Sequence, residues 1–318
     1  MRRWPVIFAL CLYAGASPLR AEEFFPTRNE NPLLRAFYLP LPSDSRQRDP
    51  DGLAAVFSVS NTLNVERRRT ESLFVDGESD TLRLSYQASL LDSWRYRVTL
   101  PITHDSGGAL DTAIADWHRG FDFQPGNRPF YPINVLRYSY SGQGNIDLKH
   151  SQTSVGSVSA EVGWYAVDDD ARTVSIWCGT QAPSGRVSKL TGDGAWDAAL
   201  WAHWAARRTS WQFAAELGVA RPFGDKLFGG SAQRASLFGR SSLTRTLNAR
   251  WSIRAQLEAQ TRRVTDSELR FLGPSVVFST GLVYRSANHW RIEMGLSEDA
   301  AVNTAPDIGF FLGLQRAK

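Results

Sequence analysis

The sequence predicts an all-β protein, an antiparallel up-and-down transmembrane β-barrel of 12 or 14 strands with one short helix in the long loop 101–133. Apolar and polar residues alternate with period two over segments of about ten residues, the length that a tilted strand needs to cross a bilayer. Tryptophans cluster near the ends of these segments, as in an interfacial girdle. A periplasmic β-sandwich is the competing class, but its strands average about 5–6 residues.

The first residues have the features of a secretory signal peptide. Arg2 and Arg3 precede an apolar stretch that runs from Pro5 to Ala16. This stretch is shorter than the roughly 20 residues that a spanning helix needs, which argues against a membrane anchor. We therefore expect residues 1–21 to be cleaved off on export in a Gram-negative bacterium, with an end at Ala16 as the alternative.

Charge and cysteine content exclude several classes of protein. The full chain carries a net charge of +4, and loss of residues 1–21 removes three arginines and no acid, which leaves +1. We therefore expect no nucleic-acid partner. Cys178 is the one cysteine beyond residue 21, so neither an internal disulfide nor a Cys/His metal cluster can form. We expect no cofactor and no metal.

Residues 22–52 lack a strand pattern. Their five prolines rule out a helix or a central strand. Leu33, Leu34, Phe37 and Tyr38 are nevertheless too apolar for a solvated tail. We expect this segment to pack on or plug one end of a barrel formed by residues 53–318.

The strands of that barrel follow from Leu53. The first ends near Leu63, and residues 80–101 form a hairpin in which alternation continues on both sides of a turn at 91–93. The later candidates are 134–152, 157–167, 172–180, 196–206, 210–220, 235–245, 249–260, 276–285, 290–296 and 308–314. About 13 candidates result, and because bacterial single-chain barrels have even strand numbers we expect 12 or 14.

Charged residues on the polar faces of the strands are the candidate lumen or ligand-binding residues. Both signs of charge occur on neighbouring strands, so we expect pairs that fill much of a small barrel, since an unpaired buried charge costs several kcal/mol. These candidates are Arg83, Arg95, Arg97, Arg250, Arg254, Glu258, Arg291 and Glu293.

The loop 101–133 holds the one group of residues with catalytic chemistry. His104, Asp111 and His118 fall within fifteen residues. A histidine oriented by a carboxylate can act as a general base in hydrolysis, and two histidines with a carboxylate can bind a metal ion. The alternative is that a loop helix packs on the barrel mouth through Ile114 and Trp117 while the polar residues cap backbone groups. These three residues are therefore catalytic candidates only, and we assign no metal site.

Five stretches, taken in order, resemble those of a known family. They read PTRNENPLLRAFYLPLP, LFVDGESDTLRLSYQASLLDSWRYRVTLP, HDSGGALDTAIADWH, KLTGDGAWDAAL and PDIGFFLGL. The chain thus resembles the proteobacterial family called domain of unknown function 3187 over nearly the whole of residues 22–318. The resemblance implies a fold like that of outer-membrane barrels and no assigned activity. The motif QAPSG at 181–185 departs from the expected Lys-Leu-Pro-Thr-Gly and lacks its lysine.

Together these features predict an integral outer-membrane protein that is not an enzyme and serves as a channel, an uptake component or a structural element. Its expected partners are outer-membrane lipid, lipopolysaccharide and an unidentified small solute. The alternatives are a membrane-embedded hydrolase that acts on lipid or acyl chains, and a soluble periplasmic β-sheet protein that binds a ligand.

Overall fold

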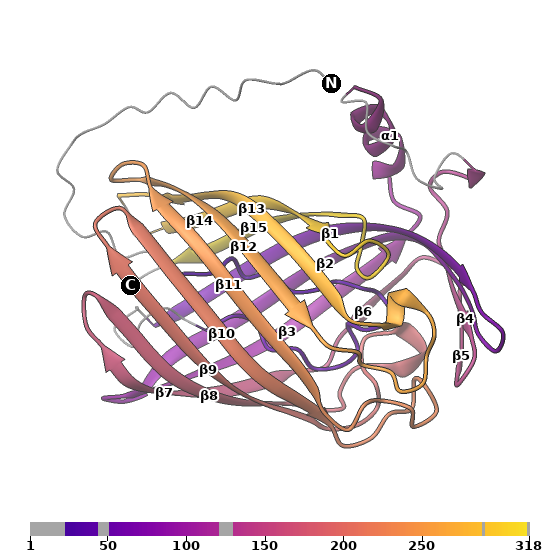
Figure 1. Ribbon diagram of the computed structural model, residues 1–318, viewed down its shortest axis with the longest axis horizontal. Helices are drawn as coiled ribbons and strands as arrows, with labels where there is room; N and C mark the ends of the chain where they lie inside the picture. Colours follow the sequence, from indigo (N-terminus) through magenta and orange to yellow (C-terminus); the bar gives the residue numbers. More distant parts are fainter. Residues whose placement is uncertain (1–22, 44–50, 121–129, 288–289, 317–318) are drawn as a thin grey trace, which may run out of the picture.

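The computed structural model describes residues 23–43, 51–120, 130–287 and 290–316, and they form a closed antiparallel β-barrel (Figure 1). Twelve strands pair in chain order, and the first closes the barrel against the last. These wall strands are β1 (Gly52–Arg67), β2 (Ser72–Leu91), β3 (Trp94–Ser106), β7 (Ser159–Asp168), β8 (Arg172–Gln181), β9 (Asp197–Arg208), β10 (Trp211–Pro222), β11 (Ser236–Thr246), β12 (Trp251–Gln260), β13 (Ser275–Arg285), β14 (Trp290–Asp299) and β15 (Ile308–Arg316). The predicted all-β barrel is confirmed, with the smaller of the two expected strand numbers.

The wall forms because each strand alternates between an inward and an outward side chain. On β12, Arg254 and Glu258 are buried, whereas Ile253 and Leu257 are 44% and 46% exposed. Short turns join the strands at one end, which we call the turn end. At the opposite end, the loop end, the connections are longer except between β1 and β2. The first wall residue, Gly52, and the last, Arg316, both lie at the turn end.

Three short strands, β4 (Arg137–Ser141), β5 (Asn145–Leu148) and β6 (Gln152–Val155), extend the wall at the loop end. β4 pairs with β2, and β6 pairs with β3. The prediction of one strand over 134–152 is therefore wrong. Gly144 lies in the turn between β4 and β5, where an added Cβ would be 2.6 Å from the carbonyl oxygen of Leu227. This segment accounts for the extra candidate in the sequence count.

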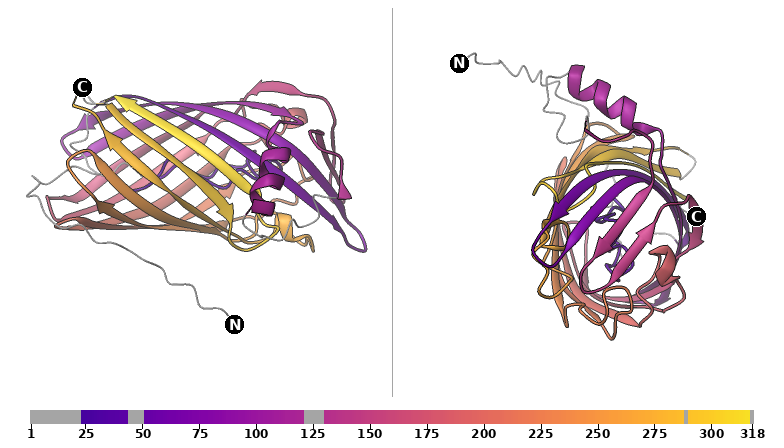
Figure 2. Two further views of the ribbon diagram at one scale, coloured as in Figure 1. Left: turned by 90° about the horizontal axis from the view of Figure 1, so that it is seen from above. Right: turned by 90° about the vertical axis from the view of Figure 1, so that its right-hand side faces the viewer.

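Several predicted boundaries also differ from the structure. β2 begins at Ser72 rather than at residue 80. β1 continues to Arg67, beyond the predicted end at Leu63, and β3 continues to Ser106, so that the long loop begins at residue 107 rather than 101. The predicted helix in that loop is confirmed as α1 (Leu110–Gly120), which lies outside the barrel wall at the loop end (Figure 2).

None of the helices in the described ranges combines the length and the hydrophobicity that a membrane-spanning helix requires.

Large apolar side chains cover the outer face of the wall. Leu53, Leu200, Leu217 and Leu237 are each more than half exposed. Trp94, Trp211, Trp251 and Trp290 are the first residues of strands that follow turns, so they mark the turn end of this outer face. Soluble monomers rarely expose a continuous apolar surface of this extent.

Candidate functional site in the barrel lumen

Residues 23–43, which we call the luminal segment, run through the interior of the barrel (Figures 1 and 2). The segment begins near the turn end, where Glu23 pairs with Arg207. It reaches the loop end at Asn31, whose side-chain amide donates to the carbonyl oxygen of Phe271 at 2.7 Å. It then reverses and returns toward the turn end. The barrel interior therefore contains two legs of the same segment.

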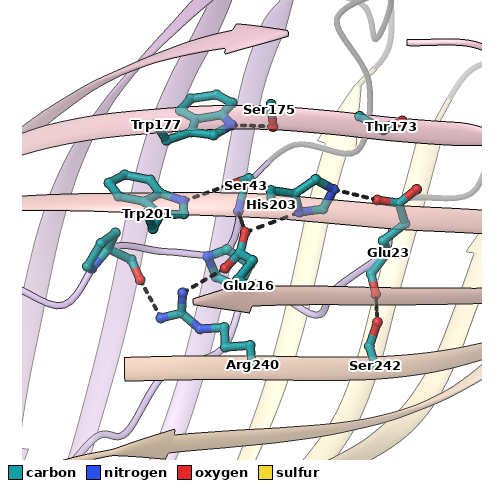
Figure 3. Close-up of polar contacts among 12 residues, drawn as sticks. Glu23, Ser43, Thr173, Ser175, Trp177, Trp201, His203, Glu216, Arg240 and Ser242 are labelled. Carbon is teal, nitrogen blue, oxygen red and sulfur yellow. Dashed lines mark hydrogen bonds and ion pairs between the residues drawn. The ribbon is translucent and has the colours of Figure 1, made fainter. Parts of the chain in front are cut away.

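A chain of buried polar side chains holds both legs (Figure 3). His203 Nε2 lies 2.9 Å from Glu23 Oε2, and His203 Nδ1 lies 3.4 Å from Glu216 Oε1. The backbone N–H of Ser43 donates to the same Glu216 oxygen at 2.7 Å. Arg240 then connects Glu216 to Glu258, whose other oxygen accepts the backbone N–H of Asn29 at 2.7 Å. Arg240 also donates to the Pro40 carbonyl oxygen, so one continuous network contacts the segment at four separate points.

The second leg, residues 36–43, is held largely through its backbone. Arg97 on β3 donates to two adjacent carbonyl oxygens, those of Leu41 and Pro42, at 2.9 and 2.6 Å. Two further wall side chains donate to carbonyl oxygens of this leg: Gln181 Nε2 to Ala36 at 3.0 Å, and Arg240 Nη2 to Pro40 at 2.6 Å. Two carboxylates accept its backbone N–H groups: Asp197 Oδ2 that of Tyr38, and Glu216 Oε1 that of Ser43, both at 2.7 Å. Five wall strands therefore bind the main chain of one irregular stretch.

An aromatic surface on the wall lies against the same leg. Trp177 and Trp201 are stacked on neighbouring strands with ring centroids 6.1 Å apart, and Phe238 continues the row. Tyr38 and Leu39 belong to this buried cluster. The Tyr38 hydroxyl donates to Glu161 Oε1 at 2.9 Å. The wall thus offers this leg both polar and apolar contacts.

At the loop end, the turn of the segment is anchored by an ion pair. Arg35 Nη2 lies 2.7 Å from Asp105 Oδ2, and both side chains are buried. Ser79 accepts a hydrogen bond from Arg35 at 2.8 Å and donates one to Asp105 at 2.7 Å. Leu33 and Phe37 pack in the largest buried apolar cluster, which includes strands and loops of the loop end. The loop end thus contains the largest buried apolar cluster of the described residues.

A buried acid, Asp193, lies in the loop before β9. It is next to Asp197, the residue that accepts the Tyr38 N–H. Asp193 is fully buried and accepts the backbone N–H of Ala195 at 3.0 Å. Burial, together with the nearby charge of Asp225, raises the pKa of Asp193 to about 6. This carboxyl group therefore changes charge in the mildly acidic range.

The structure places the predicted lumen residues as follows. Arg83 pairs with Glu30 of the luminal segment, at 2.6 Å from its Oε2. Arg254 pairs with Glu293 at 2.9 Å, and Arg291 lies 3.5 Å from the same carboxylate. Arg97 and Glu258 belong to the contacts described above, and Arg95 is buried near Ser89 and Asp51.

Arg250 does not belong to this group. It is exposed in the turn between β11 and β12. In the sequence the apolar–polar alternation of β12 continues back into this turn, so Arg250 has the same parity as the inward residues. The strand, however, begins only at Trp251.

The two candidate catalytic residues whose side chains the structure describes, His104 and Asp111, bind different partners. His104 Nδ1 lies 2.9 Å from the Thr153 hydroxyl. Asp111 is buried and binds the Asn61 amide at 2.9 Å and the Asn134 backbone N–H at 2.8 Å. His118 lies on α1, and its side chain is outside the described part of the structure. The contacts of Asp111 tie the helix to the barrel mouth.

Within the described ranges, no group of three or more His, Cys, Asp or Glu residues is arranged to hold a metal ion. The spaces between segment and wall are small. Two cavities between them measure about 50 and 30 Å³. Since one water needs about 10–15 Å³ on this measure, they have room for a few water molecules each.

Several residues of this site were not among the candidates from sequence. His203, Glu216 and Arg240 face inward by strand parity, as do Trp177 and Trp201, which alternate against the outward Ile176 and Leu200. Parity therefore contained a signal for them. For Glu23 and the backbone groups of residues 36–43, the sequence contains no such signal because the segment has no periodicity.

A family model described as "Protein of unknown function (DUF3187)" matches residues 7–317, which confirms the resemblance seen in the sequence. No curated protein sequence is similar enough to count as a match.

Several solved structures are similar to this chain. The COG4313 outer membrane channel from Pseudomonas putida F1 matches with a TM-score of 0.57 and 13% identity, over 89% of this chain and 98% of that one. The NanC porin (TM-score 0.49, 9% identity, 84% and 99% covered) and the KdgM porin (0.46, 8%, 83% and 99%) are further matches. At this identity the likeness to the Pseudomonas channel concerns the fold.

Proposed function

The chain belongs to the DUF3187 family, a family of unknown function, and from the construction of its barrel we propose that it is an outer-membrane channel closed by its own luminal segment. This proposal depends on one observation: the wall side chains hold residues 23–43 by hydrogen bonds and ion pairs, not by covalent bonds. A segment held in this way can leave the lumen while the wall stays intact.

The size of the barrel supports this proposal. Eight strands enclose an interior that side chains alone can fill, whereas larger barrels leave space for ligands or channels. In this twelve-stranded barrel that space contains the luminal segment. The wall around it has buried arginines and glutamates on neighbouring strands, such as Arg97 and Glu161. Without the segment these charged groups would line a hydrated lumen.

The outer face supports a membrane location. Exposed leucines along the strands and tryptophans at the turn end correspond to an apolar band with an aromatic girdle. Short turns face the periplasm in such barrels and longer loops face the outside. We therefore propose that the luminal segment enters from the periplasmic side, after cleavage of a signal peptide within the first 21 residues, and that lipid and lipopolysaccharide surround the wall.

Conductance in planar bilayers tests the channel. We compare the mature protein with a variant that lacks residues 23–43, and with a matched variant in which those residues are replaced by a Gly/Ser linker of equal length. We expect rare or small conductance from the mature protein and steady conductance from both variants. A deletion variant that inserts as a folded barrel and still does not conduct would indicate a structural role.

Gel mobility with and without boiling tests the barrel in its membrane. A closed barrel keeps its backbone hydrogen bonds paired and resists detergent, so unboiled protein from outer-membrane fractions should migrate differently. A protein without this shift, recovered from the soluble periplasmic fraction, would contradict the proposed location.

A further inference from the structure

The wall around residues 36–43 has the composition of a binding site for a main chain. Acidic side chains accept two of its N–H groups, at Tyr38 and Ser43. Arginine and glutamine side chains donate to four of its carbonyl oxygens. The wall residues involved are all buried, at 5% exposure or less: Arg97, Gln181, Asp197, Glu216 and Arg240. Backbone groups of this kind occur in every peptide, so these contacts do not depend on the side chains of residues 36–43.

The prolines of this stretch fit the pattern of contacts. Pro40 and Pro42 have no N–H group, so a wall that binds their carbonyl oxygens leaves no backbone donor unpaired at these positions. Residues 38–43 form neither helix nor turn. Proline restricts the unbound chain and lowers the entropy lost on binding.

The aromatic surface suits the same class of ligand. Grooves lined with aromatic side chains are a recurrent binding site for extended proline-rich peptides. Here Trp177, Trp201 and Phe238 form the surface against which Tyr38 and Leu39 pack. The wall also leaves room for the tyrosine ring at Gly179, where an added Cβ would collide with the Tyr38 hydroxyl.

The charges of the site favour a neutral ligand. Arg97 is paired with Glu161, at 2.8 Å from its Nε. Arg240 lies between Glu216 and Glu258, at 3.0 and 2.6 Å. An anionic solute that approached either arginine would therefore meet a glutamate as well, whereas a backbone carbonyl adds no charge.

We infer that this wall is a binding site for an extended, proline-containing peptide of another chain, and that residues 36–43 occupy it as an intramolecular substitute. The inference rests on the proposed function, because an external peptide must take the place of the luminal segment. The ligand class of the open lumen would then be extended, proline-containing peptides.

The test uses the variant without residues 23–43 in detergent micelles and four fluorescent peptides. The first has the sequence of residues 36–43, and the second keeps both prolines and the Tyr38 and Leu39 equivalents but has alanine at the Phe37, Leu41 and Ser43 positions. The third is the second with N-methylated amides at the Tyr38 and Ser43 positions. The fourth is a scrambled peptide without proline.

We expect the first two peptides to bind with similar affinity, and the third and fourth to bind at least about tenfold more weakly, since hydrogen bonds to charged groups are lost. Arg240→Gln should weaken binding of the second peptide. Gln181→Leu, which changes no charge, should weaken it as well. Arg245→Gln, where the side chain lies on the Trp211 ring, is the matched control and should leave binding unchanged.

Binding of the first peptide alone would mean that the wall recognises only its own segment, and would overturn the inference. Equal binding of the N-methylated peptide, or binding of neutral oligosaccharides in place of peptides, would overturn it too. If the deletion variant binds the second peptide but does not conduct, the peptide site is supported and the proposed channel function is wrong. If the deletion variant conducts but does not bind the second peptide, the channel function is supported and the inference of a peptide site is wrong.

Discussion

The imidazole of His203 lies 2.9 Å from the carboxylate of Glu23, and both side chains are fully buried. The contact joins the wall strand β9 to the start of the luminal segment over 180 residues of sequence. Because the same imidazole also lies 3.4 Å from Glu216, which binds the N–H of Ser43, it links contacts to both legs of the segment.

His203→Ala should therefore destabilise the closed barrel strongly. Removing one partner of a buried ion pair costs about 3–5 kcal/mol. Glu23 keeps its pair with Arg207, and Glu216 keeps its pair with Arg240, so we expect a loss near the lower end of this range. Urea unfolding in lipid vesicles, followed by tryptophan fluorescence, measures the loss. Asp147→Asn is the control, since Asp147 pairs with Lys149 at the surface with about half of each side chain exposed, and such pairs contribute about 0–1 kcal/mol.

The same change in the variant without residues 23–43 separates the segment from the wall. If His203 acts chiefly through Glu23, the cost of His203→Ala should fall clearly in that background. An equal cost in both backgrounds would assign the effect to Glu216 and the wall alone.

Leu217→Arg should show whether lipid covers the outer face. Leu217 lies near the middle of β10 and is 67% exposed, whereas Leu247 lies in a turn and is 55% exposed. An arginine at the membrane midplane of a barrel costs about 2–4 kcal/mol, and one near the interface about 0–1. We expect Leu217→Arg to lower the free energy of unfolding and Leu247→Arg to leave it nearly unchanged. Equal effects at both positions would mean that the outer face contacts water.

The sequence allowed the wall to be predicted but not its contents. Alternation around Ile253 and Arg254 identifies the outward and inward faces because the strand period is two. It does not identify what meets an inward side chain, as with Arg240, which binds a carbonyl oxygen 200 residues away. Parity also fails where a strand ends, as at Arg250. Likewise, Asp111 in the first turn of α1 has the same sequence pattern whether it serves catalysis or ties the helix to the barrel.

Gly163→Ala should strain the aromatic row. Gly163 is paired with Trp177 across β7 and β8, and an added Cβ would collide with the indole ring. Overpacking of this kind costs about 1–3 kcal/mol. Gly239→Ala is the matched control on β11, because the nearest atom to its Cβ would be the Glu216 carbonyl oxygen at 3.4 Å. Urea unfolding of both variants checks the difference, and near-ultraviolet circular dichroism should change only for Gly163→Ala. Unaltered aromatic signals in both would contradict the close contact.

Asp193 should make the barrel less stable as the pH rises from 4 to 6. Its pKa in the folded protein is raised to about 6 by burial and by Asp225, so the folded state binds a proton that the unfolded chain, with a pKa near 4, has already released. At about 1.4 kcal/mol per pKa unit the loss amounts to at most ~3 kcal/mol. Asp193→Asn should reduce this pH dependence and increase stability at pH 7. The measurement is the urea midpoint from pH 4 to 8.

Asp169 provides a control of opposite sign. Backbone N–H groups of Ala171 and Arg172 hold its pKa below the usual range in an exposed turn, so its contribution to stability is present above pH 4 and is lost as the pH falls. Asp169→Asn should therefore lower stability at pH 7, whereas Asp193→Asn raises it. If both changes shift the urea midpoint in the same direction at pH 7, burial does not control the charge of Asp193.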